Sequence, residues 1–304
     1  MAKAKRTADH IHPLFINGLS GRLIYLPAKG ARKREILLIQ GLHTSHERAK
    51  GLAEYLNRYG AVTSPDLPGF GGMDAFYKIG EVPTLDNLAD YLAAFIKLRY
   101  KNKRITIIAF SYGFTIITRM LQKYPEISQK VDLLISISGY VHKSDYIWKK
   151  STIILLGGAA WLASYKPTAF IVKHLFINVP VIKSIYKVAE IVHPKLKHRS
   201  EKIDFEVELW KVNDLRTYMY VSSRSFTMTT LDKGVDLQVY HVSVDNDHYF
   251  DSVRVEQNMR QVYRDIDLIK AKLPSAHVPT IIDTAKEVAP FFPPKIRSLL
   301  RKKP

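Results

Sequence analysis

Residues 104–113 read RITIIAFSYG, and two features of this stretch indicate the fold. The first seven residues form a nearly continuous apolar and β-branched run, which is typical of a strand buried on both faces of a parallel sheet. Ser111 follows at once, and a predicted helix begins at about Gly113. A serine on such a turn projects its hydroxyl above the sheet edge. A serine that only caps a helix would occupy the same position, so the turn alone leaves both interpretations open.

Similar runs alternate with amphipathic segments along most of the chain, and this alternation predicts an α/β fold with a mostly parallel sheet flanked by helices on both sides. The expected strands are Leu23 to Leu26, Glu35 to Gln40, Ala61 to Ser64, Arg104 to Phe110, Val131 to Ser138, Leu237 to Ser243 and Ile266 to Leu273. The expected helices are Glu47 to Tyr59, Thr84 to Tyr100, Gly113 to Lys123, Ser252 to Arg264 and Thr280 to Ala289, followed by a basic tail.

Residues 141–230 interrupt this alternation with a segment that is helical and aromatic in pattern. Between His142 and Ile203 there are eleven Lys and Arg against three Asp and Glu, which leaves a charge of +8. We therefore expect a core of residues 1–140 and 231–304, with residues 141–230 as a helical cap. The aromatic residues of the cap would pack its own small core or line a pocket for an apolar substrate.

Five segments in a fixed order resemble the α/β-hydrolase superfamily between about Leu23 and Phe292. They are Gln40-Gly41-Leu42, the turn Asp66-Leu67-Pro68-Gly69-Phe70-Gly71, Ser111 in Ala109-Phe110-Ser111-Tyr112-Gly113, and the pair Asp245 and His277, each following a predicted strand. Two positions depart from the family pattern. Ala109 replaces the first glycine of Gly-x-Ser-x-Gly, and Gln40 replaces the usual histidine.

The resemblance implies a serine hydrolase that acts on an ester or related acyl compound, and we expect its partner to be a small, hydrophobic acyl substrate. Ser111 would be the nucleophile, His277 the general base and Asp245 the residue that orients His277. The backbone N–H groups of Leu42 and Tyr112 would form the oxyanion hole. Gly41, His43 and Phe110 would line the substrate site. This chemistry requires neither a cofactor nor a metal.

Other carboxylates and histidines compete for these roles. Asp247 and Asp251 are alternative acids near Asp245, and the 245–248 cluster lacks the glycine and terminal glutamate of a calcium loop. The sequence predicts His241 to be a sheet residue and His248 a loop residue. His43 and His46 read as surface histidines, although His43 lies near the expected oxyanion turn.

The amino-acid composition limits which other classes of function are possible. The absence of cysteine excludes disulfides, thiolate catalysis and cysteine-based metal sites, and it fits a cytoplasmic protein. The net charge of +18 would suit a peripheral contact with an anionic membrane, whereas no nucleic-acid-binding signature accompanies it. Neither a secretory signal nor a transmembrane run is evident. The alternative function is a catalytically silent relative that serves as a binding or membrane-surface module.

Overall fold

The computed structural model of the chain describes residues 10–29, 34–178, 180–184, 203–245, 247–271 and 285–302. Within these residues, eight strands form one sheet in the order β1-β2-β4-β3-β5-β6-β7-β8. All neighbouring pairs from β4 to β8 are parallel, whereas β1 pairs with β2, and β2 with β4, in antiparallel fashion. The strands are β1 (Ile11–Ile16), β2 (Leu19–Leu26), β3 (Glu35–Ile39), β4 (Ala61–Pro65), β5 (Ile105–Phe110), β6 (Val131–Ile137), β7 (Val235–Val244) and β8 (Tyr263–Ala271).

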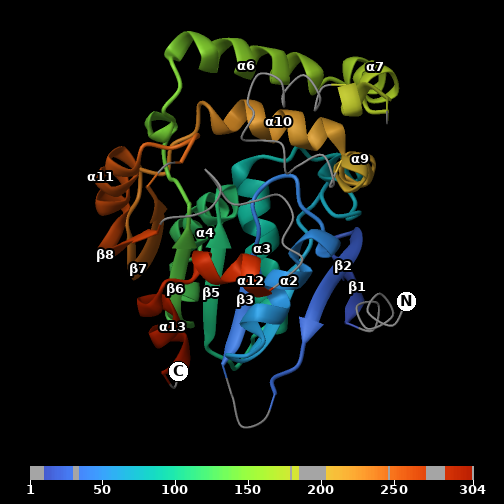
Figure 1. Cartoon of the computed structure of the whole chain (residues 1–304). Helices are drawn as coiled ribbons and strands as arrows, with labels where there is room; N and C mark the ends of the chain where they lie inside the picture. Colours follow the sequence, from blue (N-terminus) through green and yellow to red (C-terminus); the bar gives the residue numbers. More distant parts are fainter. Residues whose placement is uncertain are drawn as a thin grey trace.

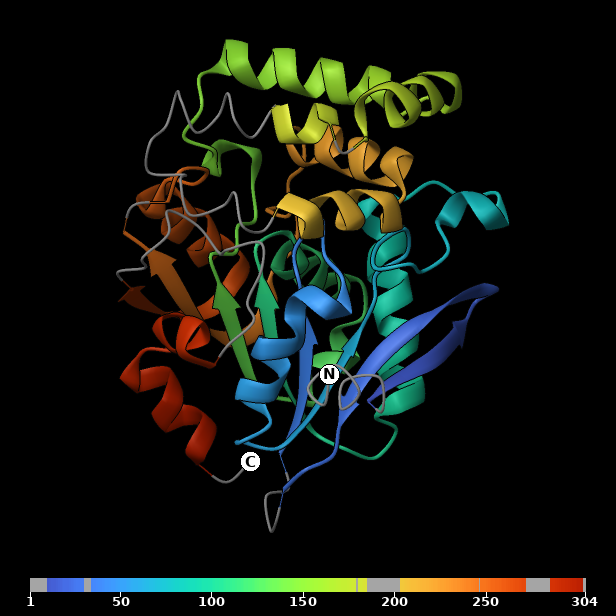
Figure 2. The same cartoon turned by 45° about the vertical axis from the view of Figure 1, so that its right-hand side comes forward.

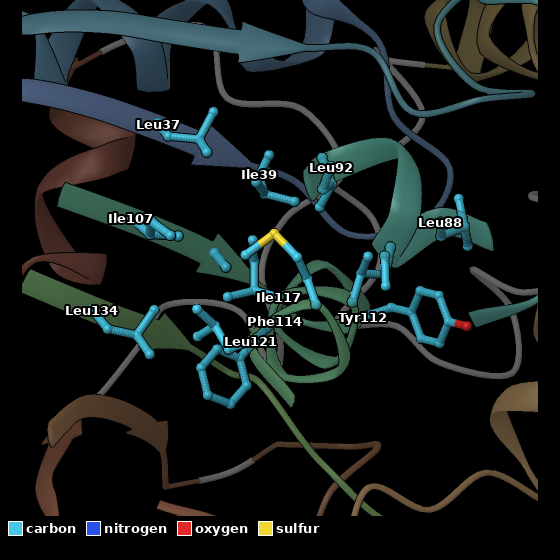
Figure 3. Packing of buried hydrophobic residues seen from close by; sticks show 14 of the residues in the cluster. Leu37, Ile39, Leu88, Leu92, Ile107, Tyr112, Phe114, Ile117, Leu121 and Leu134 are labelled. Carbon is cyan, nitrogen blue, oxygen red and sulfur yellow. The ribbon is translucent and has the colours of Figure 1, made fainter. Parts of the chain in front are cut away.

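Helices cover both faces of this sheet, and alternate residues of the central strands point to opposite faces. In β3, Leu37 and Ile39 belong to the core that packs under α3 (Leu85–Arg99) and α4 (Tyr112–Lys123), as Figure 3 shows. Ile36 and Leu38 belong to a second core under α2 (His46–Leu56) and α13 (Pro294–Arg301). This burial on both faces explains why the central strands read as continuous apolar runs.

Between β6 and β7, the residues that the structure describes include four helices that we call the cap. They are α6 (Lys150–Ala163), α7 (Lys166–Phe176), α9 (Ile203–Val212) and α10 (Leu215–Ser225). Figures 1 and 2 show the cap above the end of the sheet to which the parallel strand arrows point, with α6 and α7 outermost. The expected fold class, a mostly parallel sheet flanked by helices with a helical insertion after β6, is therefore confirmed.

The remaining helices connect or flank the strands of the core. Among the described residues they are α5 (Pro125–Ser128), α11 (Ser252–Val262), α12 (Ala285–Val288) and short 3₁₀ turns at Phe76–Ile79, Lys143–Asp145 and Ala289–Phe291. Thr84 caps α3 as expected, because its side chain accepts a hydrogen bond from the Asn87 N–H.

The boundary between α11 and β8 lies earlier than the sequence predicts. We expected the helix to continue to Arg264 and the strand to begin at Ile266, but α11 ends at Val262 and β8 begins at Tyr263. Tyr263 pairs with Val235 across the sheet, and its buried hydroxyl hydrogen-bonds to Thr118 at 2.7 Å. Strand pairing and burial of this tyrosine therefore outweigh the local helical pattern.

The C-terminal segment expected to be a basic tail is also an amphipathic helix. In α13, Ile296 and Leu300 lie one turn apart and are 0% and 1% exposed, respectively. They join the core that includes Ile36 and Leu38 on one face of the sheet. The basic residues of this segment occupy the other positions of the helix, which is why composition alone suggests a solvated tail.

Replacing Leu300 by Ala tests whether α13 is part of the core. The substitution removes a fully buried side chain, so we expect the free energy of unfolding to fall by about 2–5 kcal/mol. Ser298→Ala, at an exposed position of the same helix, should leave it almost unchanged. Urea denaturation followed by circular dichroism measures both, and equal stability of the two variants would contradict the packing of α13.

Candidate functional site

Ser111 occupies a strained turn between β5 and α4. Its backbone angles are φ 47° and ψ −126°, a region that residues with a side chain rarely adopt. Ser111 holds the N-cap position of α4, yet its side chain makes no capping hydrogen bond. The turn is held by the backbone, because the Ser111 N–H donates to the Ile137 carbonyl at 3.0 Å. The side chain of Ser111 therefore does not cap the helix.

Two glycines let this turn pack against the loop that follows β3. A Cβ atom at position 113 would clash with the carbonyl oxygen of Gln40. A Cβ atom at position 41 would lie 3.2 Å from the Ser111 Cβ and 3.7 Å from its hydroxyl oxygen. The main chain at Gly41 consequently runs directly beside Ser111.

The two departures from the family pattern are accommodated in this packing. Ala109 is fully buried at the end of β5, where its small side chain fits the close approach of strand and helix. The Gln40 side chain accepts a hydrogen bond from the Thr44 hydroxyl, and so braces the loop that carries Leu42 from within. Neither residue disturbs the turn at Ser111.

Six of the residues singled out in the sequence line one pocket of about 620 Å³. They are Gly41, Leu42, His43, Phe110, Ser111 and Tyr112. Tyr112 is the first residue of α4, and N–H groups in the first turn of a helix have no partner within the helix. Its side chain is buried in the core that Figure 3 shows, with its ring 6.3 Å from the ring of Tyr140.

Apolar and aromatic side chains make up most of the pocket wall. Tyr140, Tyr146 and Phe250 pack with ring centroids 4.2–5.4 Å apart. The cap closes the pocket from above, with α6 contributing Leu156, Ala159, Ala160 and Ala163 and α10 contributing Tyr218, Met219, Ser222 and Ser225. Arg48 of α2 is the charged residue among these lining residues that the structure describes. The pocket therefore suits a largely apolar ligand.

His43 and Asn213 connect the cap to the loop beside Ser111. The Asn213 side-chain amide donates to His43 Nδ1 at 3.2 Å, and its oxygen accepts from the Gly71 N–H at 2.8 Å. The His43 ring also lies 4.1 Å from the ring of Trp210. Sequence reasoning missed Asn213, because nothing in its local sequence distinguishes it from a helix-ending asparagine.

His43 and His46 are not surface histidines as the sequence suggested. His43 is only 9% exposed and has a positive φ of 56°, and His46 is fully buried. Nε2 of His46 lies 3.2 Å from the carboxylate of Asp66, in the Asp-x-Pro-Gly-x-Gly turn. Burial lowers the pKa of His46 to about 4 and raises the pKa of Asp66 well above its usual range. This pair supports the turn, and neither residue is among those that line the pocket.

Asp245, the expected acid, lies at the edge of the sheet where the parallel strands end. Asp245 directly follows β7, which is separated from β5 by β6, and the three strands are parallel. Its side chain is exposed, and its N–H donates to the carbonyl of Ala271, the last residue of β8. His277 lies outside the described residues. The proposed contact between Asp245 and His277 therefore stays a prediction.

The rival residues have other structural roles. The Asp247 side chain accepts from the N–H groups of Tyr249 and Phe250, and Asp251 caps α11. His241 is buried and hydrogen-bonds to Ser136 at 2.9 Å, as expected for a sheet residue, and burial lowers its pKa to about 4. In the part of the chain that the structure describes, no three histidine or carboxylate side chains are grouped to hold a metal.

The fold is widely shared among solved structures of low sequence identity. An esterase from Thermogutta terrifontis is 15% identical, with a TM-score of 0.56 and coverage of 86% of this chain and 88% of its own. A hydrolase from Pseudomonas aeruginosa is 14% identical, with a TM-score of 0.61 and coverage of 89% and 92%. An N-formylmaleamic acid deformylase from Pseudomonas putida is 16% identical, with a TM-score of 0.59 and coverage of 86% and 92%.

No curated protein sequence matches the chain. Residues 35–163, which include β3, the turn at Ser111 and the start of the cap, match the family model described as the alpha/beta hydrolase fold. This match agrees with the parallel sheet, the strained serine turn and the similar solved structures. The chain therefore has the α/β-hydrolase fold, and its residues 35–163 match the model of that family.

Proposed function

We propose that the protein is a serine hydrolase that cleaves an ester or related acyl compound through Ser111. The observation that carries the proposal is the strained backbone of Ser111, which lies beside an apolar pocket and has no capping role. Backbone strain at a residue with a side chain is retained where the surrounding structure enforces it, commonly at catalytic turns. Asp245 and His277 complete the proposed triad.

The reaction would proceed through an acyl-enzyme. His277 removes the proton from the Ser111 hydroxyl, and the oxygen attacks the substrate carbonyl carbon. The N–H groups of Leu42 and Tyr112 stabilise the oxyanion, at about 3 kcal/mol per donor. His277 then protonates the leaving group. In the second half of the reaction, His277 takes a proton from water, the resulting hydroxide attacks the acyl carbon, and the proton returns to the Ser111 oxygen as the acid is released. Asp245 orients His277 and stabilises its charged form.

The pocket favours substrates with an apolar acyl or alcohol part. Most of its wall is apolar and includes the aromatic cluster around Tyr146 and the small residues Ala159, Ala160 and Ala163 of α6. A polar group placed against the apolar part of this wall would lose hydration without gaining a hydrogen bond there. We therefore expect a preference for hydrophobic esters, which a series of p-nitrophenyl esters of increasing chain length would reveal.

A fluorophosphonate probe tests the nucleophile directly. The wild-type protein should be labelled covalently at Ser111, and Ser111→Ala should abolish labelling, because the probe reacts with activated serines. Ser222→Ala is the matched control, since Ser222 also lines the pocket but lies on the cap. Intact-protein mass spectrometry followed by peptide mapping locates the adduct.

The same labelling separates the two candidate functions. A folded wild-type protein that stays unlabelled would favour the catalytically silent module over the hydrolase. Labelling that persists in the Ser111 variant would assign the nucleophile to another residue.

Gly113→Ala tests the close approach beneath the oxyanion site. The new Cβ would force α4 away from the carbonyl of Gln40 and so displace the Tyr112 N–H from the reacting carbonyl. A displacement of about 1 Å commonly costs on the order of 100-fold in rate, so we expect ester hydrolysis to fall by about that factor. Gly158→Ala, at an open position of α6, should retain activity. Equal rates for both variants would contradict this geometry.

Asn substitutions at the carboxylates identify the acid of the triad. Asp245→Asn should lower kcat by about ten-thousand-fold, because the amide cannot hold the histidine in its reactive form. Asp247→Asn should retain most activity, since an amide oxygen can still accept from the Tyr249 and Phe250 N–H groups. Steady-state kinetics compares the two variants. A larger loss at Asp247 would transfer the acid role to that residue.

A further inference from the structure

The outward side of α6 is apolar and exposed. Ile154, Leu155 and Leu162 are 64%, 72% and 56% exposed, and Trp161 is 46% exposed. No residue of this fourteen-residue helix is buried. A water-exposed helix of a globular protein normally carries polar residues on its outward side. The composition of α6 is therefore unfavourable for a helix that faces water alone.

The next helix extends this surface. In α7, Phe170, Ile171 and Leu175 are 63%, 51% and 60% exposed. The two helices follow each other directly in the sequence, and Figures 1 and 2 show them together as the outermost layer of the molecule. We call the seven residues Ile154, Leu155, Trp161, Leu162, Phe170, Ile171 and Leu175 the outer cap surface. Clustered exposed apolar side chains of this kind mark an interaction site.

The formal charges of the segment that carries the outer cap surface are all positive. Lys149 and Lys150 flank the start of α6, and Lys166 and Lys173 lie in or beside α7, all of them exposed. The sequence contains no Asp or Glu between Asp145 and Glu190. An apolar surface bordered by lysines, with no acidic residue in this segment, is complementary to anionic lipid headgroups above an acyl layer.

The length of α6 limits how it could meet a bilayer. Fourteen residues extend about 21 Å at 1.5 Å per residue, which is shorter than the roughly 30 Å hydrocarbon core. Within the described residues, no helix is long and apolar enough to cross a membrane. A contact with lipid would therefore place α6 along the surface of the bilayer.

We propose that the outer cap surface docks the protein on membranes rich in anionic phospholipid. Leu155, Trp161 and Leu162 insert among the headgroups and upper acyl chains, and the lysines contact the phosphates. The opposite side of α6 lines the pocket above Ser111 through Ala160 and Ala163. Docking thus brings the pocket next to the lipid layer, but it requires no activity of Ser111.

Vesicle co-sedimentation tests this proposal with the full chain. Wild-type protein should bind vesicles of mixed phosphatidylcholine and phosphatidylglycerol more strongly than vesicles of phosphatidylcholine alone. Leu155→Asp/Leu162→Asp should lower binding to the anionic vesicles at least about ten-fold, because charged residues are costly in the apolar layer. Lys149→Glu/Lys150→Glu should remove the preference for anionic vesicles.

Matched variants distinguish this surface from general charge and hydrophobicity. Leu98→Asp changes a leucine of α3 that is 62% exposed, and should bind as the wild type does. Lys101→Glu/Arg104→Glu changes two exposed basic residues before β5, and should also retain binding. Ser111→Ala should bind normally, so a failure of the proposed chemistry would be distinguishable from a failure of docking.

Three outcomes would overturn the proposal. The wild-type protein could fail to bind either type of vesicle, or the Leu98 control could lose as much binding as the double aspartate variant. Analytical ultracentrifugation could show a dimer that Leu155→Asp/Leu162→Asp dissociates, without lipid binding by the wild type. That last result would assign the outer cap surface to contacts between copies of this chain.

Discussion

The close packing of two turns is the constraint on which the site depends. The loop after β3 and the turn after β5 meet so closely that there is no room for a side chain at Gly113. A Cβ atom added to Gly41 would lie only 3.2 Å from the Cβ atom of Ser111. Parallel pairing of β3 with β5 sets the two turns at the same edge of the sheet. The positive φ of Ser111 follows from this arrangement, because the chain must reverse sharply to enter α4.

The cap is fitted to these turns through polar and aromatic contacts. Asn213 bonds both His43 and Gly71, and Trp210 packs on the His43 ring. These contacts connect the end of α9 to two separate loops of the core. The position of the cap and the conformation of the loop beside Ser111 are consequently coupled, and a change in one would alter the other.

The central strands and the serine turn could be predicted because their signals are local. The run from Ile105 to Phe110 is buried on both faces, so its composition reflects its position directly. Strand β1 escaped prediction because it lies at the edge and contains Pro13, which lacks a donor but is tolerated there. Its turn, Asn17-Gly18, with both residues at positive φ, was the available signal. The role of Asn213 comes from its contacts with His43 and Gly71, which are far away in the sequence, so a local pattern could not predict it.

The sequence left open whether the cap lines a substrate pocket and whether it contacts a membrane, and helix α6 bears on both questions. A helix that is apolar on all sides requires two apolar partners, one on each side. The pocket above Ser111 supplies one of them through Ala160 and Ala163. The other side, with Leu155 and Leu162, faces outward among lysines. The same composition would therefore serve both proposals, an inner wall for an apolar substrate and an outer surface for lipid, with the thickness of one helix between them.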